Sequence, residues 1–161
     1  MRLYPLLRRT TPTRRTPATA YDRAMHPSEL VQLLADKGQR LDAMTALVGS
    51  VNSRELRSVS VDDTTLTALL AGLSDPNPRV RWWCVQLLDH IPDPRAVVGI
   101  ERALDDPVPS VRRNAAHALA CTTCKPAWDG ALAERTIARL EEMARSDPNA
   151  KVRAEARHAL R

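Results

Sequence analysis

A motif that occurs three times from residue 75 onward limits the fold more than any other feature of this sequence. The copies align without gaps and read DPNPRVRWWCVQLL from Asp75, DPVPSVRRNAAHAL from Asp106 and DPNAKVRAEARHAL from Asp147. The first two begin 31 residues apart and the last two begin 41 apart, with the extra residues near CTTCKPAWDG. Repetition at such a period is typical of solenoids, in which every unit buries its apolar face against its neighbours.

Each copy of the motif follows another segment with the apolar spacing of a helix. These segments are DTTLTALLAGL, DPRAVVGIERAL and ALAERTIARLEEMARS. The repeat unit is therefore predicted to be a helix A, a short Asp-Pro turn and a helix B. Asn77 is expected to cap the first helix B, and Pro78 to take its first position, where a missing N–H costs nothing. We expect at least ten helical residues in each of 78–90, 109–120 and 150–160.

Two further helices are predicted before the first repeat. In HPSELVQLLADKG, Ser28 is expected to cap a helix that Gly38 ends. Its apolar face is Leu30, Val31, Leu33 and Leu34. In QRLDAMTALVGSV, the residues at helical spacing are Leu41, Met44, Leu47, Val48 and Val51. The segment NSRELRSVSVDD has no clear period and predicts a longer connection, and CTTCKPAWDG predicts a loop after which Trp128 starts the last helix A.

The motif D-P-x-P-x-V-R-x-x-A-x-x-x-L resembles helix B of the short bacterial HEAT repeats, also called phycobilisome-lyase-like HEAT repeats. IPDPRAVVGIERALDDP, from Ile91 to Pro107, is similar to the linker and helix A of that family. The resemblance covers about residues 62–161, with 25–61 as a degenerate first pair. It implies an all-α fold, an α-solenoid with a right-handed superhelix of about three to four helix pairs, with helix B on the concave side. The spacing of 31 is shorter than the ~40–47 residues usual for HEAT units.

The resemblance also implies a role for the Asp and Arg of the motif, which bridge neighbouring repeats in that family. Carried over to this sequence, they are expected to form a structural ladder rather than a basic binding stripe. The ladder residues are Asp75, Arg81, Asp106, Arg112, Asp147 and Arg153.

The net charge of +5 comes entirely from residues 1–24, because the rest of the chain holds equal numbers of basic and acidic residues. Pro, Thr and Arg without apolar periodicity predict a disordered basic tail at 1–24, followed by the solenoid domain at 25–161. Three interpretations of the tail stay open: an upstream extension with Met25 as the true start, a basic arm for an acidic partner or nucleic acid, and a transit peptide.

The odd number of cysteines, without a secretory signal, favours a reducing compartment, and the protein is expected to be cytoplasmic. No segment approaches the apolar length of a membrane span, so no membrane partner is predicted.

Trp82 is the candidate anchor for a partner. Relative to the apolar face of its helix, Trp83 flanks that face and Trp82 points away from it. Later repeats carry Arg113 and Ala154 at the position of Trp82, which predicts a partly exposed tryptophan and fits a binding hot spot. The alternative is that the first helix pair covers it. The residues expected to bind a partner on the concave face are Arg79, Trp82, Gln86, Arg113, His117, Lys151 and His158.

His117, Cys121 and Cys124 form H-x3-C-x2-C, the start of a zinc site that His158 or Cys84 would complete. A single C-x2-C without a second pair is a weak candidate, so neither a metal nor another cofactor is predicted. Cys84 aligns with alanines in the later repeats and is expected to be a small buried residue.

No nucleophile–base pair, glycine-rich phosphate loop or carboxylate pair stands out in the sequence, so the chain is expected not to be an enzyme. The predicted function is a non-enzymatic scaffold that binds another protein on its concave face. The first alternative is a nucleic-acid binder that uses the basic N-terminal arm and the same face. The second is an accessory lyase-like HEAT protein, although no site residue of the bilin lyases carries over.

Overall fold

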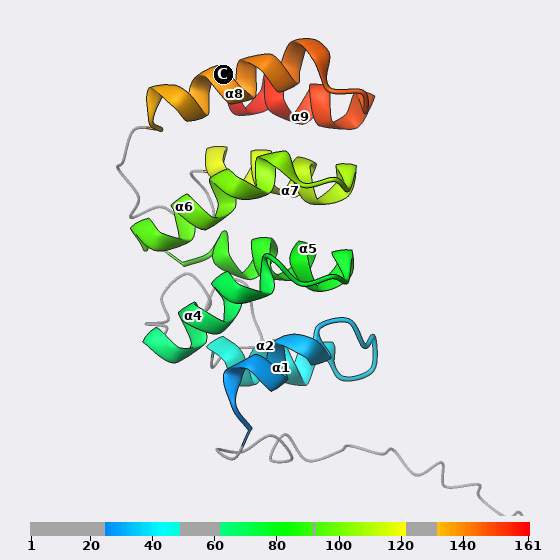
Figure 1. Cartoon of the computed structure of the whole chain (residues 1–161), viewed down its shortest axis with the longest axis vertical. Helices are drawn as coiled ribbons and strands as arrows, with labels where there is room; N and C mark the ends of the chain where they lie inside the picture. The colour runs from blue at the N-terminus through cyan, green and yellow to red at the C-terminus, as the bar shows by residue number, and fades with distance from the viewer. Residues whose placement is uncertain (1–24, 49–61, 92, 122–131) are drawn as a thin grey trace, which may run out of the picture.

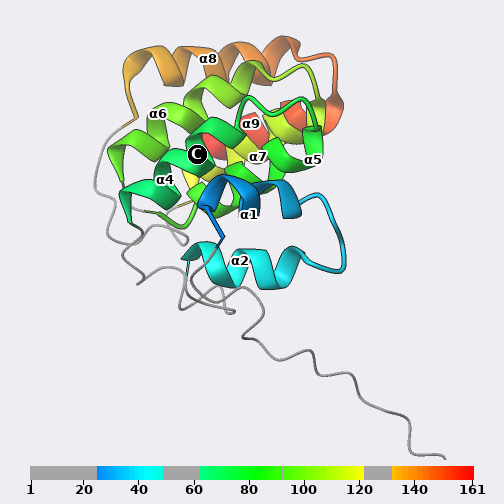
Figure 2. The same ribbon diagram turned by 60° about the horizontal axis from the view of Figure 1, so that its bottom comes forward.

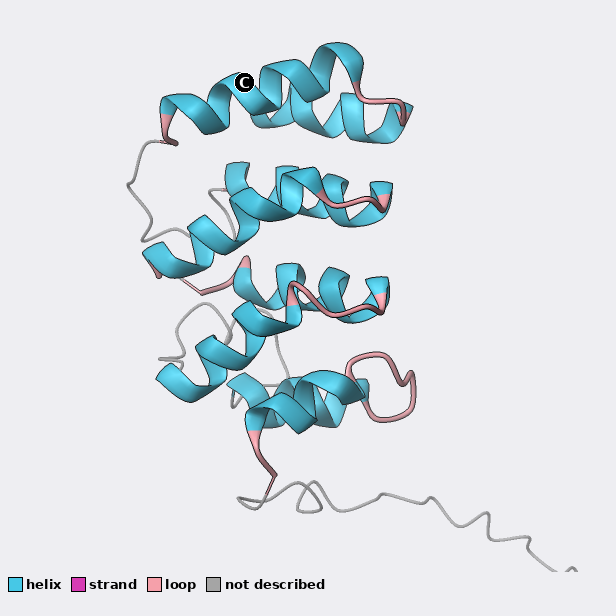
Figure 3. Ribbon diagram, in the orientation of Figure 1, coloured by secondary structure: helices cyan, strands magenta, loops and turns pink. Residues whose placement is uncertain are grey.

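The computed structural model describes residues 25–48, 62–91, 93–121 and 132–161, whose regular elements are helices without a strand (Figure 3). The helices form pairs stacked one on another, which confirms the predicted all-α solenoid (Figure 1). In chain order they are α1 (Pro27–Leu33), α2 (Arg40–Val48), α4 (Asp63–Gly72), α5 (Pro78–Leu88), α6 (Pro94–Arg102), the 3-10 turn η1 (Ala103–Asp105), α7 (Pro109–Ala120), α8 (Glu134–Ser146) and α9 (Ala150–Ala159).

The repeats stack in two layers. Helices α4, α6 and α8 form what we call the helix-A layer, and α5, α7 and α9 form the helix-B layer (Figure 1). Within the helix-B layer, α5 packs against α7 and α7 against α9. At the N-terminal end of the stack, α1 packs against α4, and α2 lies beside α1 (Figure 2).

The Asp-Pro turn has the same local geometry in all three repeats. The carboxylates of Asp75, Asp106 and Asp147 each accept a hydrogen bond from the backbone N–H two residues later, at 2.7–2.8 Å. Asn77 caps α5 by accepting from the backbone N–H of Arg79, as predicted. The predicted helices B are confirmed, with 11 residues in α5, 12 in α7 and 10 in α9.

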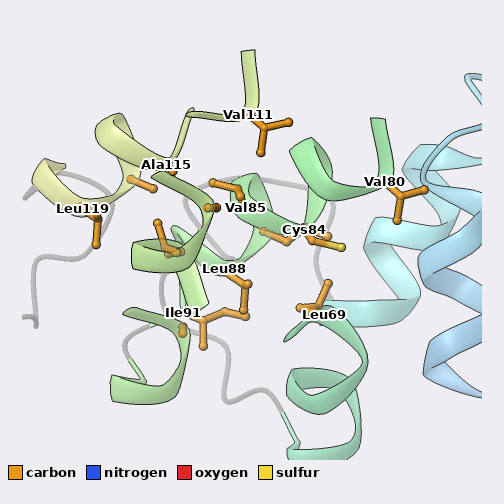
Figure 4. Packing of buried hydrophobic residues seen from close by; sticks show 14 of the residues in the cluster. Leu69, Val80, Cys84, Val85, Leu88, Ile91, Val111, Ala115 and Leu119 are labelled. Carbon is orange, nitrogen blue, oxygen red and sulfur yellow. The ribbon is translucent and has the colours of Figure 1, made fainter. Parts of the chain in front are cut away.

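The core runs through the stack along the buried faces of the B helices. Val80, Cys84 and Leu88 of α5 are buried, with Cys84 Sγ directed toward Gly72 of α4, and α7 contributes Val111 and Ala115 at the positions that match Val80 and Cys84 (Figure 4). Cys84 is fully buried, as expected from its alignment with alanines. Burial raises the pKa of this thiol to about 12, so it stays protonated at neutral pH and is a poor nucleophile.

The first helix pair departs from the predicted boundaries. Ser28 was expected to be the N-cap, but α1 begins at Pro27, because the ring of His26 accepts the hydrogen bond that a serine hydroxyl would take. The helix ends at Leu33, before Gly38. Leu41, expected on the apolar face of α2, is 57% exposed, because α2 buries Ala43 instead, about 200° further round the helix.

Several predictions fall outside the described residues. They concern the basic tail at 1–24, Val51 of the second predicted helix, the connection that follows it, and the inserted segment with Cys124 and Trp128. These remain predictions. No helix in the described ranges is long and apolar enough to cross a membrane.

Gly72 of α4 lies where side chains of α1 and α5 pack directly against its backbone. A Cβ atom there would lie 2.5 Å from Cys84 Sγ and 2.8 Å from Val31 Cγ1, and both side chains are buried. We expect Gly72→Ala to lower the free energy of unfolding by about 1–3 kcal/mol, because overpacking outweighs the higher helix propensity of alanine. Urea denaturation measures the change.

Gly38→Ala is the matched control. Its Cβ would approach only Asp36 Oδ1, at 3.3 Å, in an exposed turn. The free energy of unfolding should therefore change by less than ~0.5 kcal/mol. Equal stability of the two variants would contradict a close three-helix contact at Gly72.

Candidate functional site

Two buried arginines connect neighbouring repeats of the helix-B layer. Arg81 donates from Nε and Nη2 to both carboxylate oxygens of Asp106, at 2.7 and 3.0 Å. Arg112 binds Asp147 in the same bidentate way, at 2.8 and 3.0 Å. The Nη1 group of Arg81 also donates to the backbone carbonyl of Asp75 at 2.8 Å. Each guanidinium therefore joins the turn of its own repeat to the aspartate of the next.

These ion pairs are shielded from water, since all four side chains are at most 11% exposed. The hydrogen bond from Arg112 holds the pKa of Asp147 below its ordinary value, and the bond to Asp106 raises the pKa of Arg81. Arg81 and Asp147 therefore stay charged at neutral pH. A buried charge that loses its partner is strongly destabilising.

The two ends of the ladder differ from its middle. At the N-terminal end, Gln32 of α1 donates to the carboxylate of Asp75 at 2.8 Å, in the place where a preceding arginine would bind. At the other end, Arg153 donates to the backbone carbonyls of Asp147 and Pro148. Within the described residues it has no carboxylate partner, and its side chain is partly exposed.

The two adjacent tryptophans have different surroundings. Their rings meet edge to face, with centroids 4.7 Å apart. The guanidinium of Arg40, from α2, lies 4.6 Å from the centre of the Trp83 ring, a cation–π contact. Both tryptophans are partly buried and pack against the core. The first helix pair thus covers the Trp83 ring through Arg40. No arginine of the described residues stacks on the Trp82 ring.

One repeat position of helix B reaches back to the preceding helix. Asn114 of α7 donates to the backbone carbonyl of Trp82 in α5 at 3.1 Å. At the same position of the next repeat, Glu155 of α9 accepts from Nδ1 of His117 in α7 at 3.2 Å. These contacts hold the B helices in a fixed register.

All seven residues expected to bind a partner lie on the helix-B layer. Trp82 and Gln86 are partly buried, whereas the others are exposed: Arg79, Arg113, His117, Lys151 and His158. Helices α5, α7 and α9 contain a single acidic residue, Glu155. The surface of this layer is therefore basic.

The structure adds a residue to the metal-ligand candidate. His117 and Cys121 lie together at the end of α7, and Asp89 at the end of α5 joins them. One ligand atom from each of the three lies within 4.8 Å of the others. Sequence reasoning missed Asp89 because it belongs to the preceding repeat. The signal was available in the alignment, since Asp89 follows the closing leucine of its motif, and Cys121 comes just after the same point in the next.

A groove of about 560 Å³ lies between α4 and α6 on the helix-A layer. Its apolar lining consists of Leu70, Leu73, Pro94, Val98, Gly99 and Ala103. The volume falls within the range of small-molecule sites. Sequence reasoning missed this groove as well, because its residues come from two successive repeats and form no motif.

Comparison with known proteins finds one family and a related structure. The HEAT repeats family matches residues 66–161. No curated protein matches the sequence significantly. Among solved structures, the chain is similar to human deoxyhypusine hydroxylase in complex with glycerol, with a TM-score of 0.55 and 24% identity over 86% of this chain. The match spans 43% of the hydroxylase chain, and at this identity it shows the fold alone.

The lack of a catalytic motif predicts a protein that is not an enzyme, and this comparison contradicts that prediction, because an enzyme has the same fold. In a stack of repeats, side chains from neighbouring helices meet although they lie far apart in the chain. A site of this kind leaves no motif in the sequence. Asp89 and His117 are an example.

Removal of Arg112 tests the energetic role of the ladder. Arg112→Ala leaves the buried carboxylate of Asp147 without its guanidinium, and we expect the free energy of unfolding to fall by about 3–5 kcal/mol. Arg153→Ala is the matched control, because Arg153 binds only backbone carbonyls and is partly exposed. It should cost about 0.5–1.5 kcal/mol. Similar losses in the two variants would contradict a special role for the Arg112–Asp147 pair.

The same pair predicts a dependence on pH. The folded-state pKa of Asp147 is lowered, so its contribution is present above the unfolded value of about 3.9 and is lost as the pH falls through the folded value. The stability difference between the wild-type protein and Arg112→Ala should therefore narrow as the pH falls from about 5 to 3. Urea denaturation at several pH values in this range measures the stability difference. A difference that does not change with pH would contradict a lowered pKa of Asp147 that depends on Arg112.

Proposed function

This chain belongs to the HEAT repeat family, and we propose that it is a protein-interaction module whose helix-B layer binds an acidic segment of a partner protein. HEAT repeats generally mediate protein interaction. The observation that carries the finer proposal is the partly exposed Trp82 within a layer where Arg79, Arg113 and Lys151 make no ion pair with a described residue.

Trp82 has the properties of an anchor. Its ring rests against Trp83, which Arg40 and the core hold in place, so little side-chain entropy is lost when a partner covers it. Arg113 occupies the same repeat position on α7, beside it in the layer. Tryptophan and arginine are the residue types most enriched in binding hot spots.

The charges of the two layers favour an acidic partner. On the helix-A layer, Arg95 binds Asp63, and Arg135 binds Glu101. On the helix-B layer, the exposed cations Arg79, Arg113 and Lys151 make no ion pair with any described residue. Complementary charge speeds encounter and selects the partner.

Nucleic acid is the alternative ligand for the same cations. The six arginines among residues 1–24 also favour it, because phosphate contacts dominate nucleic-acid affinity. The two ligand classes respond differently to nuclease and to loss of the tail, so one experiment separates them.

The test is capture of partners by the full chain from nuclease-treated lysate, quantified by mass spectrometry. Trp82→Ala and Arg113→Glu should each reduce recovery of the same proteins by at least about tenfold, the loss typical of a hot-spot residue. Arg102→Glu, an exposed cation of the helix-A layer, is the control and should retain them. Recovery that is equal in all variants would overturn the proposal.

Deletion of residues 1–24 separates the two ligand classes. A protein partner bound to the helix-B layer should be captured equally well without the tail. A nucleic-acid ligand should be lost on nuclease treatment, and tail deletion should lower the salt slope of binding by about one for each lost phosphate contact. The second pattern would replace the protein partner with nucleic acid.

A further inference from the structure

The ends of two neighbouring B helices converge on a cluster of three metal-ligating side chains. Asp89 is the C-cap of α5, and Cys121 is the C-cap of α7. His117 lies one turn before Cys121, whose backbone N–H donates to the His117 carbonyl at 3.0 Å. The carboxylate, the ring nitrogen and the thiol each offer one ligand atom, all within 4.8 Å of one another. We propose that this cluster binds a zinc ion.

The ligand types select the metal. Thiolate, imidazole and carboxylate are the ligands that zinc takes in proteins, whereas magnesium and calcium prefer oxygen alone. Zinc bonds of about 2.0–2.3 Å in a tetrahedron place ligand atoms roughly 3.3–3.8 Å apart. His117 and Cys121 are both partly or largely exposed, so small rotations of these side chains close the remaining gap.

The surroundings favour a cation at this point. The C-terminal ends of α5 and α7 both meet at the cluster, and the negative ends of two helix dipoles stabilise positive charge there. Asp89 is only 1% exposed, so water screens its carboxylate weakly and its attraction for a nearby cation is stronger than at the surface.

A second carboxylate orients the histidine. Glu155 of α9 accepts a hydrogen bond from Nδ1 of His117 at 3.2 Å, which leaves the lone pair on Nε2 for a metal. A carboxylate on the far nitrogen of a metal-binding histidine is the usual outer-shell arrangement, and it fixes the tautomer and the ring direction. Two successive repeats thus supply the three ligands, and the next repeat supplies Glu155, which orients His117.

The site has access to solvent. The side chain of His117 is 47% exposed, and three protein ligands leave the fourth tetrahedral position to water or to a donor atom of a bound molecule. The cluster lies at the opposite end of the B helices from Arg79, and His117 is the one residue that it shares with the set expected to bind a partner.

Zinc titration of the full chain against a chromophoric competitor chelator tests the proposal. We expect one zinc per chain and a zinc-dependent rise in Tm, because a ligand that binds only the folded state stabilises it. Asp89→Asn, His117→Asn and Cys121→Ser should each weaken binding by more than about tenfold, and Glu155→Gln by about tenfold. Co²⁺ in place of zinc should show a thiolate charge-transfer band that Cys121→Ser removes.

His26→Asn is the matched control, because His26 is an exposed histidine at the start of α1 that lies outside the cluster. Its zinc affinity should equal that of the wild-type protein. Should Asp89→Asn not fold, as judged by circular dichroism, the two variants of more exposed residues, His117→Asn and Cys121→Ser, decide the question. The proposal is overturned if zinc does not bind, if His26→Asn weakens zinc binding as much as His117→Asn does, or if Cys124→Ser abolishes zinc binding while Asp89→Asn leaves it unchanged.

Discussion

The stack depends on a guanidinium that is buried between two repeats and binds the aspartate of the next one. Taking both charges out of water is costly, and the bidentate geometry of Arg81 with Asp106 and of Arg112 with Asp147 offsets that cost only at one relative position of the helices. Apolar contacts have no direction of their own, so apolar packing of α5 on α7 would by itself allow several relative positions of the two helices. The ion pair selects one of them, and it thereby fixes the register of the helix-B layer.

A fixed register places residues that hold the same repeat position side by side on neighbouring helices. The candidate sites are built from such neighbouring residues. Trp82 and Arg113 share a position and form the centre of the proposed partner surface. Asp89 and Cys121 are the C-caps of the neighbouring helices α5 and α7, and both lie near His117. The groove between α4 and α6 arises in the same way on the other layer.

Much of the fold can be predicted from the sequence because its main determinants are local. The cap at Asn77, the proline at Pro78 and the helical spacing of the apolar residues specify α5 without help from distant residues. The predicted boundaries of the B helices agree with the structure. The first pair was less predictable. A histidine ring replaced the expected serine cap at α1, and the burial of α2 depends on α1 rather than on its own pattern. The part played by Asp89 needed the stack itself, since two helix ends must meet before its carboxylate reaches His117.

A double-mutant cycle on Arg81 and Asp106 tests the central claim most directly. The free energy of unfolding is measured for the wild-type protein, Arg81→Met, Asp106→Asn and the double variant, which isolates the interaction from the cost of each change. We predict a coupling free energy of at least about 2 kcal/mol, within the range found for residues in one ion-pair network. A coupling free energy below about 0.5 kcal/mol would show that the two residues act independently, and the register of the repeats would then rest on apolar packing and on the hydrogen bonds of Asn114 and Glu155.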